Sequence, residues 1–158
     1  GLDVRIVRPF NAYGPRLLGD EYGQVVAMFF QAILKNQPIE LHNGGEQTRS
    51  FTWIADIVDG FFRAGMLDST IEGGSLSGIA VNIGSIEEVS IHALQQQIYS
   101  VVKNSSWERV MPEVRITEGY HGDAKRRLPD CSGAEQMLGW TTKTDLHQGL
   151  TLMWEQLR

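Results

Sequence analysis

The sequence predicts a mixed α/β fold in which short strands alternate with amphipathic helices. The β-branched run 4–7 stops at a loop containing Pro9, Gly14 and Pro15, and such a rigid loop ends a buried strand. Apolar residues at helical spacing recur further along the chain, and short apolar runs bounded by turn residues lie between them. Because no repeat or low-complexity tract interrupts this order, we expect one domain over residues 1–158.

Beyond the loop, the next predicted elements are a helix, a strand, a turn and a second strand. Residues 25–34 have helical apolar spacing and stop before the Asn-Gln-Pro run at 36–38, which is typical of a helix end. A short strand at 39–41 precedes Asn-Gly-Gly-Glu at 43–46, a turn of the type that joins two strands. Residues 49–54 alternate in the manner of a strand.

A second helix is predicted at 57–67, opened by Asp56 or Ala55. Its apolar residues form one stripe, which we expect to be buried. The stripe consists of Ile57, Val58, Phe61, Phe62 and Met66. The Gly- and Ser-rich run 68–78 is predicted to be a surface loop, and 79–83 a further strand.

The remainder of the chain is predicted to be mainly helical. Ser90 and Ser132 are the expected N-caps, because a serine hydroxyl can accept a hydrogen bond from a free backbone N–H of the first turn. The helices are expected at 91–103, 134–138 and 146–157. A short strand at 114–116 precedes the last two helices.

Composition limits the partners that the chain can have. The net charge of −5 argues against a nucleic-acid partner, because a polyanion binder usually presents a basic face. No run of eighteen apolar residues is present, so no membrane partner is expected. The single cysteine, Cys131, excludes an internal disulfide and fits a reducing cytoplasm, where we expect the protein to be located. We assign no metal ligands.

The most informative segment is Arg-Pro-Phe-Asn-Ala-Tyr-Gly-Pro-Arg at 8–16. Loops at the carboxyl ends of strands in open α/β sheets bind ligands, so polar groups here are candidate ligand contacts. The segment resembles the R-x-x-N-x-Y-G-P-R signature of the extended short-chain dehydrogenases/reductases, which include nucleotide-sugar epimerases, dehydratases and decarboxylases. The resemblance implies the C-terminal, substrate-binding part of such an enzyme. It would carry one or two strands of the Rossmann sheet, without the N-terminal dinucleotide-binding half.

This resemblance assigns roles to three residues of the loop. It implies that Asn11 binds the sugar or the diphosphate, that Arg16 is a further substrate contact, and that Pro9 approaches the nicotinamide of NAD. Without the resemblance, the same residues would be interpreted as a structural turn and a solvated charge.

A second motif is Gly-Gly-Glu-Gln-Thr-Arg-Ser-Phe at 44–51. It resembles the family's G-x-x-x-x-R-D/S-F segment, which implies that Arg49 binds the nucleotide diphosphate. A guanidinium can present two parallel N–H groups to phosphate oxygens, which a lysine cannot do. The alternative is that Arg49 forms a surface ion pair with Asp56 or Glu46.

A third motif covers residues 120–130 and resembles the family's D-x-x-x-R-x-P-D element. The similarity is greatest to UDP-glucuronate decarboxylases, so a UDP-sugar is the favoured substrate. It implies that Arg127 contacts the substrate, with a possible catalytic role as an acid, and that Tyr120 lines the nucleotide site. Asp130 is expected to hold the arginines and to cap the next helix. The alternative is a solvated loop.

Two apparent motifs are rejected. Tyr99 and Lys103 have the spacing of the family's catalytic Tyr-x-x-x-Lys couple, but that couple lies on a helix before the Arg-Pro-Phe-Asn strand, upstream of residue 1. The glycine run at 73–78 follows no buried strand and lacks the acidic residue of a dinucleotide fingerprint. We therefore expect NAD to be the cofactor of the full-length parent, and this chain alone not to bind it.

The sequence thus predicts the nucleotide-sugar-binding portion of an NAD-dependent epimerase, dehydratase or decarboxylase that is inactive alone. The alternatives are a non-catalytic nucleotide-sugar binder, a subunit completed by a separate Rossmann half, and a parent that is a UDP-sugar 4-epimerase. The run 4–7 would normally be an inner strand, so its unpaired edge favours homo-oligomers.

Overall fold

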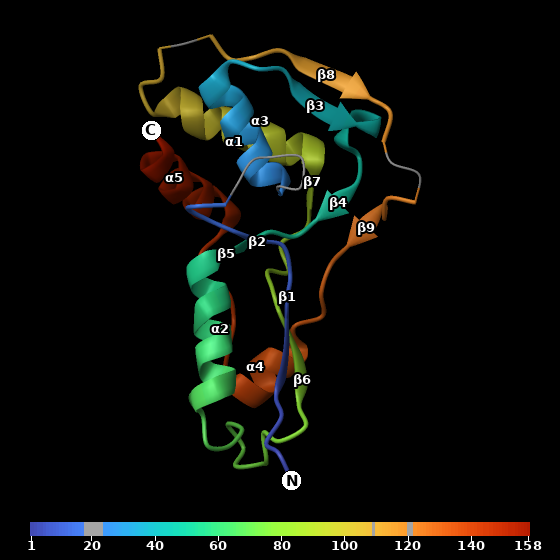
Figure 1. Ribbon diagram of the computed structural model, residues 1–158, viewed down its shortest axis with the longest axis vertical. Coiled ribbons are helices and arrows are strands. Elements are labelled where there is room, and N and C mark those ends of the chain that lie inside the picture. Colours follow the sequence, from blue (N-terminus) through green and yellow to red (C-terminus); the bar gives the residue numbers. More distant parts are fainter. Residues whose placement is uncertain (18–23, 109, 120–121) are drawn as a thin grey trace.

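The computed structural model describes residues 1–17, 24–108, 110–119 and 122–158. Figure 1 shows an elongated molecule with two regions along its long axis. The helices are α1 (Val25–Lys35), α2 (Ile54–Met66), α3 (Ile91–Asn104), α4 (Ser132–Leu138) and α5 (Leu146–Leu157). The upper region contains α1, α3 and α5, and the lower region contains α2 and α4.

The strands are short and mostly parallel. They are β1 (Ile6–Pro9), β2 (Ala12–Tyr13), β3 (Ile39–His42), β4 (Thr48–Arg49), β5 (Thr52–Trp53), β6 (Ala80–Ile83), β7 (Val89–Ser90), β8 (Val114–Thr117) and β9 (Arg126–Arg127). The parallel pairs are β1 with β6, β2 with β5, β3 with β8, and β4 with β9. Strand β4 also pairs with β7 in the antiparallel sense, so the order of this sheet is β7-β4-β9.

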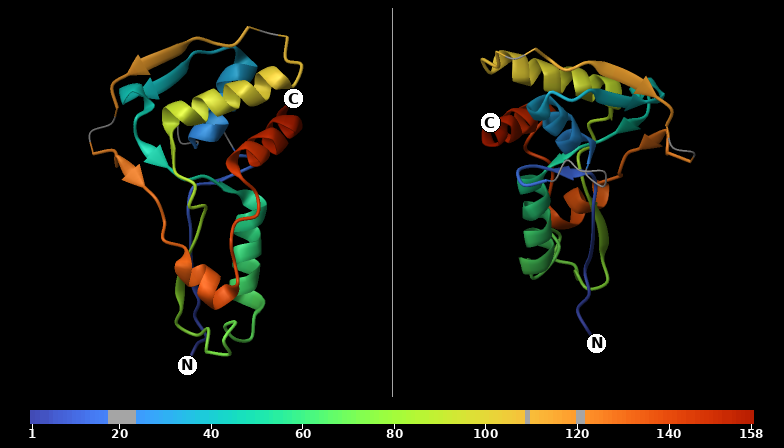
Figure 2. Two further views of the ribbon diagram at one scale, coloured as in Figure 1. Left: turned by 180° about the vertical axis from the view of Figure 1, so that it is seen from behind. Right: turned by 45° about the horizontal axis from the view of Figure 1, so that its top comes forward.

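The upper region encloses a large apolar core. Helices α1, α3 and α5 and strand β3 contribute buried side chains to it, and Figure 2 shows these elements together at one end of the molecule. Trp154 is fully buried at its centre, where it stacks on Phe30 with ring centroids 5.6 Å apart. Ser90 and Asp145 cap α3 and α5, because their side chains accept hydrogen bonds from backbone N–H groups in the first turn.

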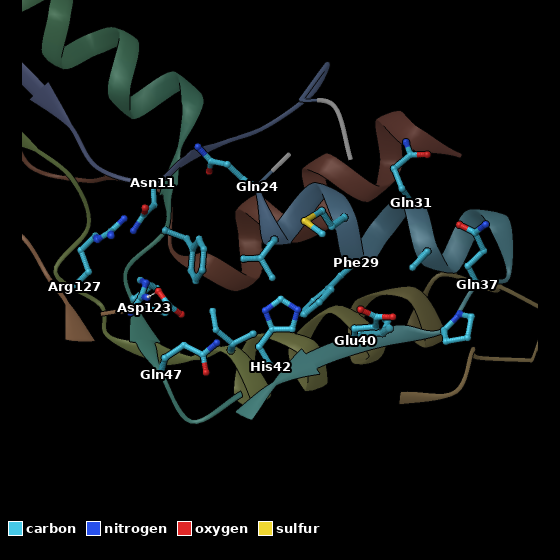
Figure 3. A pocket seen from close by; sticks show the side chains of 18 of the residues that line it. Asn11, Gln24, Phe29, Gln31, Gln37, Glu40, His42, Gln47, Asp123 and Arg127 are labelled. Carbon is cyan, nitrogen blue, oxygen red and sulfur yellow. Dashed lines mark hydrogen bonds and ion pairs between the residues drawn. The ribbon is translucent and has the colours of Figure 1, made fainter. Parts of the chain in front are cut away.

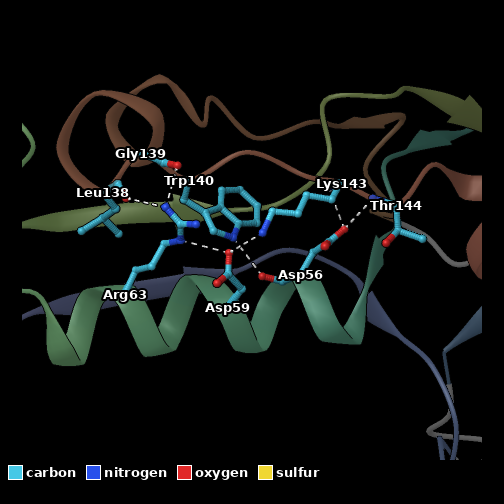
Figure 4. Close-up of polar contacts among 8 residues, drawn as sticks. All are labelled: Asp56, Asp59, Arg63, Leu138, Gly139, Trp140, Lys143 and Thr144. Atoms are coloured by element: carbon cyan, nitrogen blue, oxygen red, sulfur yellow. Dashed lines mark hydrogen bonds and ion pairs between the residues drawn. The ribbon is translucent and has the colours of Figure 1, made fainter.

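The lower region has a smaller core, centred on Ile83 and Trp140. Polar contacts join α2 to the segment around α4 (Figure 4). Trp140 Nε1 donates to the carbonyl of Asp56 at 2.9 Å, and Arg63 donates to the carbonyls at the end of α4. The Asp56 carboxylate accepts from the backbone N–H groups of Lys143 and Thr144. These bonds fix the helix pair beside the β1–β6 strands.

The outer face of α2 contradicts one prediction. Only Ile57 of the expected stripe is buried, and the rest of the stripe is exposed, with Phe62 at 64% and Met66 at 67%. Gly60 and Ala64 lie on the buried face instead, and Gly60 contacts Ile83. The helix therefore has apolar residues on an exposed face as well as on the face that this chain covers. Within the described residues, β1 likewise pairs only with β6.

The mixed α/β class is confirmed, but several local predictions are wrong. The predicted strand 49–54 is two strands, β4 and β5, and α2 begins already at Ile54. The turn at 43–46 is a 3₁₀ turn (Asn43–Gly45), and it joins no hairpin because β3 pairs with β8. Ser132 is not a cap but lies inside α4, where its N–H donates to Asp130 Oδ1.

Candidate functional site

A cavity of about 720 Å³ lies between α1, β3 and the β4–β9 pair (Figure 3). Its walls come from segments far apart in the sequence. Apolar side chains form part of its lining, among them Val25, Met28, Phe29, Ile39 and Phe51. Figure 3 shows polar side chains at both ends, so the cavity can hold a ligand with polar groups at both ends.

One end of the cavity carries two arginines. The parallel register of β4 and β9 places Arg49 opposite Arg127, so both side chains leave the sheet on the same face. Arg49 is 8% exposed; it donates from Nη1 to the Thr48 carbonyl at 2.7 Å and from Nη2 to Asp123 Oδ1 at 2.8 Å. Arg127 is exposed and lines the same cavity. This end is suited to an anion.

Asn11 lies at the same end, beside Arg127 (Figure 3). Its backbone φ is 39°, a left-handed conformation that asparagine tolerates better than most residues. Its Nδ2 donates to the Ser50 carbonyl at 2.7 Å, and its own carbonyl accepts from the Thr52 N–H. The loop after β1 is thereby tied to the segment between β4 and β5.

The opposite end of the cavity is mixed in charge. Figure 3 shows Gln37 and Glu40 at this end, and His42 and Gln47 between it and the arginines. Strand β3 alternates, with Ile39 buried in the core and Glu40 exposed on the other face. The ends therefore differ in charge, since one has two guanidinium groups with one carboxylate, that of Asp123, and the other has the carboxylate of Glu40.

The structure brings together three of the predicted site residues and leaves two outside. Asn11, Arg49 and Arg127 line one cavity. Arg16 is exposed and Pro9 is part of β1, and neither lines it. Tyr120 lies outside the described residues. The roles of all these side chains stay predictions.

The predicted alternatives for the charged side chains can also be compared with the structure. Arg49 pairs with Asp123 and not with Asp56 or Glu46. Arg126 forms an exposed pair with Glu88 at 2.8 Å, which lowers the pKa of that carboxyl. Asp130 Oδ1 accepts from the N–H of Ser132, the first residue of α4, and this bond lowers the pKa of the Asp130 carboxyl, but the N-cap position is Cys131. Among the described residues, Asp130 forms no ion pair with Arg126 or Arg127, so the expectation that it holds the arginines is wrong.

Asp123 and Gln47 line the cavity, and sequence reasoning did not select them as site residues. A signal was available for Asp123, because it is the first residue of the D-x-x-x-R-x-P-D element and lies four residues before Arg127. For Gln47 the only signal was its position two residues before Arg49, on the same face of an extended segment.

The two rejected motifs lie in different parts of the structure, and their rejection stays a prediction. Tyr99 donates a hydrogen bond to the carbonyl of Pro112, and burial raises the pKa of its hydroxyl. The glycine run at 73–78 lies in the loop after α2. Within the described ranges, no group of three or more His, Cys, Asp or Glu side chains could hold a metal ion. The same ranges contain no helix with the length and hydropathy needed to cross a membrane.

Comparisons with known proteins give a consistent result. A sequence profile for GDP-mannose 4,6 dehydratase matches residues 1–153. UDP-glucuronic acid decarboxylase 3 of Arabidopsis thaliana is 35% identical over all 158 residues, which cover 42% of that protein. UDP-N-acetyl-alpha-D-glucosaminuronate decarboxylase of Bacillus cytotoxicus is 31% identical over 156 residues, or 98% of this chain and 46% of the relative. The chain thus spans less than half the length of these relatives.

A solved structure has the same fold. UDP-glucuronic acid 4-epimerase from Bacillus cereus, in complex with UDP-glucuronic acid and NAD, superimposes with a TM-score of 0.84. The match covers 99% of this chain and 45% of the epimerase, at 23% identity. The expected fold, part of an extended short-chain dehydrogenase/reductase, is therefore confirmed.

Proposed function

The chain belongs to the GDP-mannose 4,6-dehydratase family of extended short-chain dehydrogenases/reductases, and from this premise we propose that it is the nucleotide-sugar-binding portion of an NAD-dependent enzyme. The observation that carries the proposal is the meeting of Asn11, Arg49 and Arg127 at one end of a single cavity. The curated relatives are decarboxylases of nucleotide-linked sugar acids, which supports an anionic nucleotide sugar as the ligand.

Each of the three residues has a role in this proposal. Arg49 and Arg127 bind the diphosphate through charge-assisted hydrogen bonds, which are stronger than bonds between neutral groups. Asp123 and the Thr48 carbonyl hold the Arg49 guanidinium in place, so that little side-chain entropy is lost when the ligand binds. Asn11, fixed by Ser50, contacts the sugar or the diphosphate. The main contribution of these residues is to orient the substrate.

Decarboxylation of a UDP-linked sugar acid is the reaction that we favour for the parent enzyme, because both sequence relatives described above are decarboxylases. Epimerisation is the second candidate, because an epimerase shares the fold at a TM-score of 0.84. An assay of a longer protein that contains this chain, with UDP-glucuronate as the substrate, distinguishes the two reactions. Release of carbon dioxide indicates decarboxylation, and a C4 epimer of unchanged mass indicates epimerisation.

We further propose that this chain binds no NAD and turns over no substrate by itself. In the parent enzyme, NAD supplies the transient oxidation of the sugar. The residues present do not fit a dinucleotide site, because the glycine run at 73–78 follows a helix instead of a strand. Tyr99 is hydrogen-bonded to Pro112, away from the cavity residues. Stoichiometric NAD binding by the chain would contradict this proposal.

The exposed surface of the lower region supports a second part of the proposal. In this region the outer face of α2 is exposed, and within the described residues β1 pairs only with β6, so its other edge is free. We propose that a dinucleotide-binding half covers the outer face of α2 and adds a parallel strand next to β1. A second copy of the chain is the alternative occupant. The single Cys131 is consistent with a cytoplasmic location for the assembled protein.

Calorimetric titration with UDP, UDP-glucuronate and NAD tests the binding role. We expect the chain to bind UDP and UDP-glucuronate but not NAD. Arg127→Ala should weaken the affinity for each of the two uridine nucleotides by about tenfold or more, because one charge-assisted contact is lost. Arg126→Ala is the matched control, because Arg126 lies on the same strand but pairs with Glu88 outside the cavity. Equal losses in the two variants would argue against a specific site, and absence of UDP binding would contradict the function.

A further inference from the structure

One buried hydroxyl, that of Thr52, connects the ends of two strands beside the cavity. Thr52 is 1% exposed and does not line the cavity itself. Its Oγ1 donates to the Phe10 carbonyl at 2.9 Å and accepts from the Ser85 N–H at 2.9 Å. Phe10 directly follows β1, and Ser85 lies two residues after β6, so a single side chain of β5 links the carboxyl ends of both strands.

The segment that contains Thr52 also holds Asn11, which does line the cavity. The Thr52 N–H donates to the Asn11 carbonyl at 3.1 Å, and Asn11 Nδ2 donates to the Ser50 carbonyl at 2.7 Å. Asn11 has a φ of 39°, a left-handed conformation that persists only when neighbouring contacts impose it. The hydrogen bonds from segment 50–52 to residues 10–11 therefore fix the backbone from which the Asn11 side chain reaches the cavity.

The hydroxyl of Thr52 is the part of this arrangement that a residue of similar shape cannot replace. Valine is branched at Cβ like threonine but has no hydroxyl. With valine at position 52, the Phe10 carbonyl and the Ser85 N–H each lose a hydrogen bond, and an unpaired buried polar group is costly. A loop that moves to pair these groups with water displaces Asn11, because residues 10 and 11 are adjacent in the chain.

We propose that Thr52 is a positioning residue for substrate binding, whose hydroxyl holds the backbone of Phe10 and Asn11 so that the Asn11 side chain meets the nucleotide sugar. This inference rests on the proposed function, because it needs a nucleotide sugar that contacts Asn11. Thr52 makes no contact with the ligand and acts only through Asn11, since it lies outside the lining of the cavity. A misplacement of a binding group by about 1 Å is enough to weaken its contact with the substrate.

The test is a double-mutant cycle on the affinity for UDP-glucuronate, measured by calorimetry for Thr52→Val, Asn11→Gly and the double variant. Glycine removes the Asn11 side chain and tolerates the positive φ. We expect Thr52→Val to weaken binding by about fivefold in the wild-type background. In the Asn11→Gly background it should weaken binding by less than about twofold, because the side chain through which Thr52 acts is absent. Thr52→Ser, which keeps the hydroxyl, should bind within about twofold of the wild type.

Ser105→Ala is the matched control for a loss of stability alone. The Ser105 hydroxyl also donates to a backbone carbonyl, that of Val102, and accepts from an N–H, the Nε1 of Trp154, but it lies away from the cavity. Ser105→Ala should lower the melting temperature and leave the affinity for UDP-glucuronate unchanged. A merely structural role of Thr52 would give the same pattern for Thr52→Val.

If Thr52→Val fails to fold, Thr52→Cys takes its place in the cycle, because a thiol is a weaker donor and acceptor than a hydroxyl; the expected loss is then about threefold. Unchanged affinity in the Thr52 variant, or equal losses in both backgrounds, would overturn the inference. The proposed function would still stand if Arg127→Ala weakens binding. Absence of UDP-glucuronate binding by the wild type would overturn both.

Discussion

The upper and lower regions of the molecule differ in how completely they bury their apolar surface. In the upper region, α1, α3 and α5 turn their apolar faces toward one another, and Trp154 and Leu150 at the centre are fully buried. In the lower region, α2 buries Ile57 but exposes Val58, Phe61, Phe62 and Met66. The same chain therefore contains one region that is complete by itself and one that is half covered.

This difference in burial indicates which region forms the substrate cavity and which region contacts the proposed dinucleotide-binding half. The cavity lies against the complete region, so its walls are set by a core that does not depend on another part of the protein. The half-covered region carries the β1–β6 strands, which belong to the sheet of the proposed dinucleotide-binding half. Substrate binding and cofactor binding are thus assigned to separately stabilised regions, and the following predictions test that separation.

The largest effect is expected from the upper core. Trp154→Ala removes a fully buried ring that stacks on Phe30 and donates from Nε1 to Ser105, and it should cost about 3–5 kcal/mol of unfolding free energy. Phe62→Ala in the lower region should change that free energy by less than about 0.5 kcal/mol. Urea denaturation followed by circular dichroism measures both. Similar losses would show that the regions do not differ as described.

The second prediction contrasts two glycines of α2. A Cβ at Gly60 would lie 2.7 Å from Ile83 Cγ2, so Gly60→Ala should destabilise the chain by about 1–3 kcal/mol through overpacking. A Cβ at Gly65 meets nothing within 4 Å, so Gly65→Ala should stabilise by about 0.5–1 kcal/mol through helix propensity. Thermal unfolding of both variants measures these changes in stability. A stabilising Gly60→Ala would mean that α2 is not held tightly against β6.

The third prediction concerns the two ion pairs of the β7-β4-β9 sheet. Asp123→Asn leaves Arg49, whose side chain is 10% exposed, without its counter-ion, and should cost about 1–2 kcal/mol. Glu88→Gln breaks the exposed pair with Arg126 and should cost less. Denaturation at low and high salt distinguishes them, because added salt should erase the smaller loss first. A larger cost for Glu88→Gln would contradict the burial of the cavity pair.

The smallest change in stability, but a clear change in assembly, is expected at the outer face of α2. Phe62→Ser replaces a ring that is 64% exposed, so the folded monomer should lose almost nothing. The wild-type chain should self-associate at high concentration through this face and the β1 edge, and the variant should do so less. Light scattering over a concentration series measures the effect. A wild type that remains monomeric would contradict the alternative of a second copy.

The sequence predicted the elements that depend on local patterns. Helices α3 and α5 were located almost to the residue, because Ser90 and the apolar spacing are local signals. The strands β2, β7 and β9 were missed, because each is two residues long and exists only through pairing with distant segments. The outer face of α2 was misjudged because periodicity identifies an apolar stripe without showing whether this chain or another partner covers it.

The candidate site also contains residues that the sequence predicted and residues that it did not. Asn11, Arg49 and Arg127 were selected because their motifs are local in sequence, and the structure places them in one cavity. The partner of Arg49 could not be deduced, since Asp123 is 74 residues away and competes with the nearer carboxylates Asp56 and Glu46. Gln47 was missed because its place in the cavity wall depends on packing that no sequence pattern records.

The pairing of β4 with β9 also determines when the two arginines can meet during translation of the chain. The strand that brings Arg127 opposite Arg49 is synthesised long after β4, because α2, α3 and the strands β5 to β8 lie between them in the sequence. A nascent chain that ends before it can already fold α1 and β3, yet it presents only one of the two guanidinium groups. Long-range strand pairing is also slow to form. Affinity for a nucleotide should therefore arise only after β9 has been synthesised, and truncated products that end before β9 should not compete for the ligand.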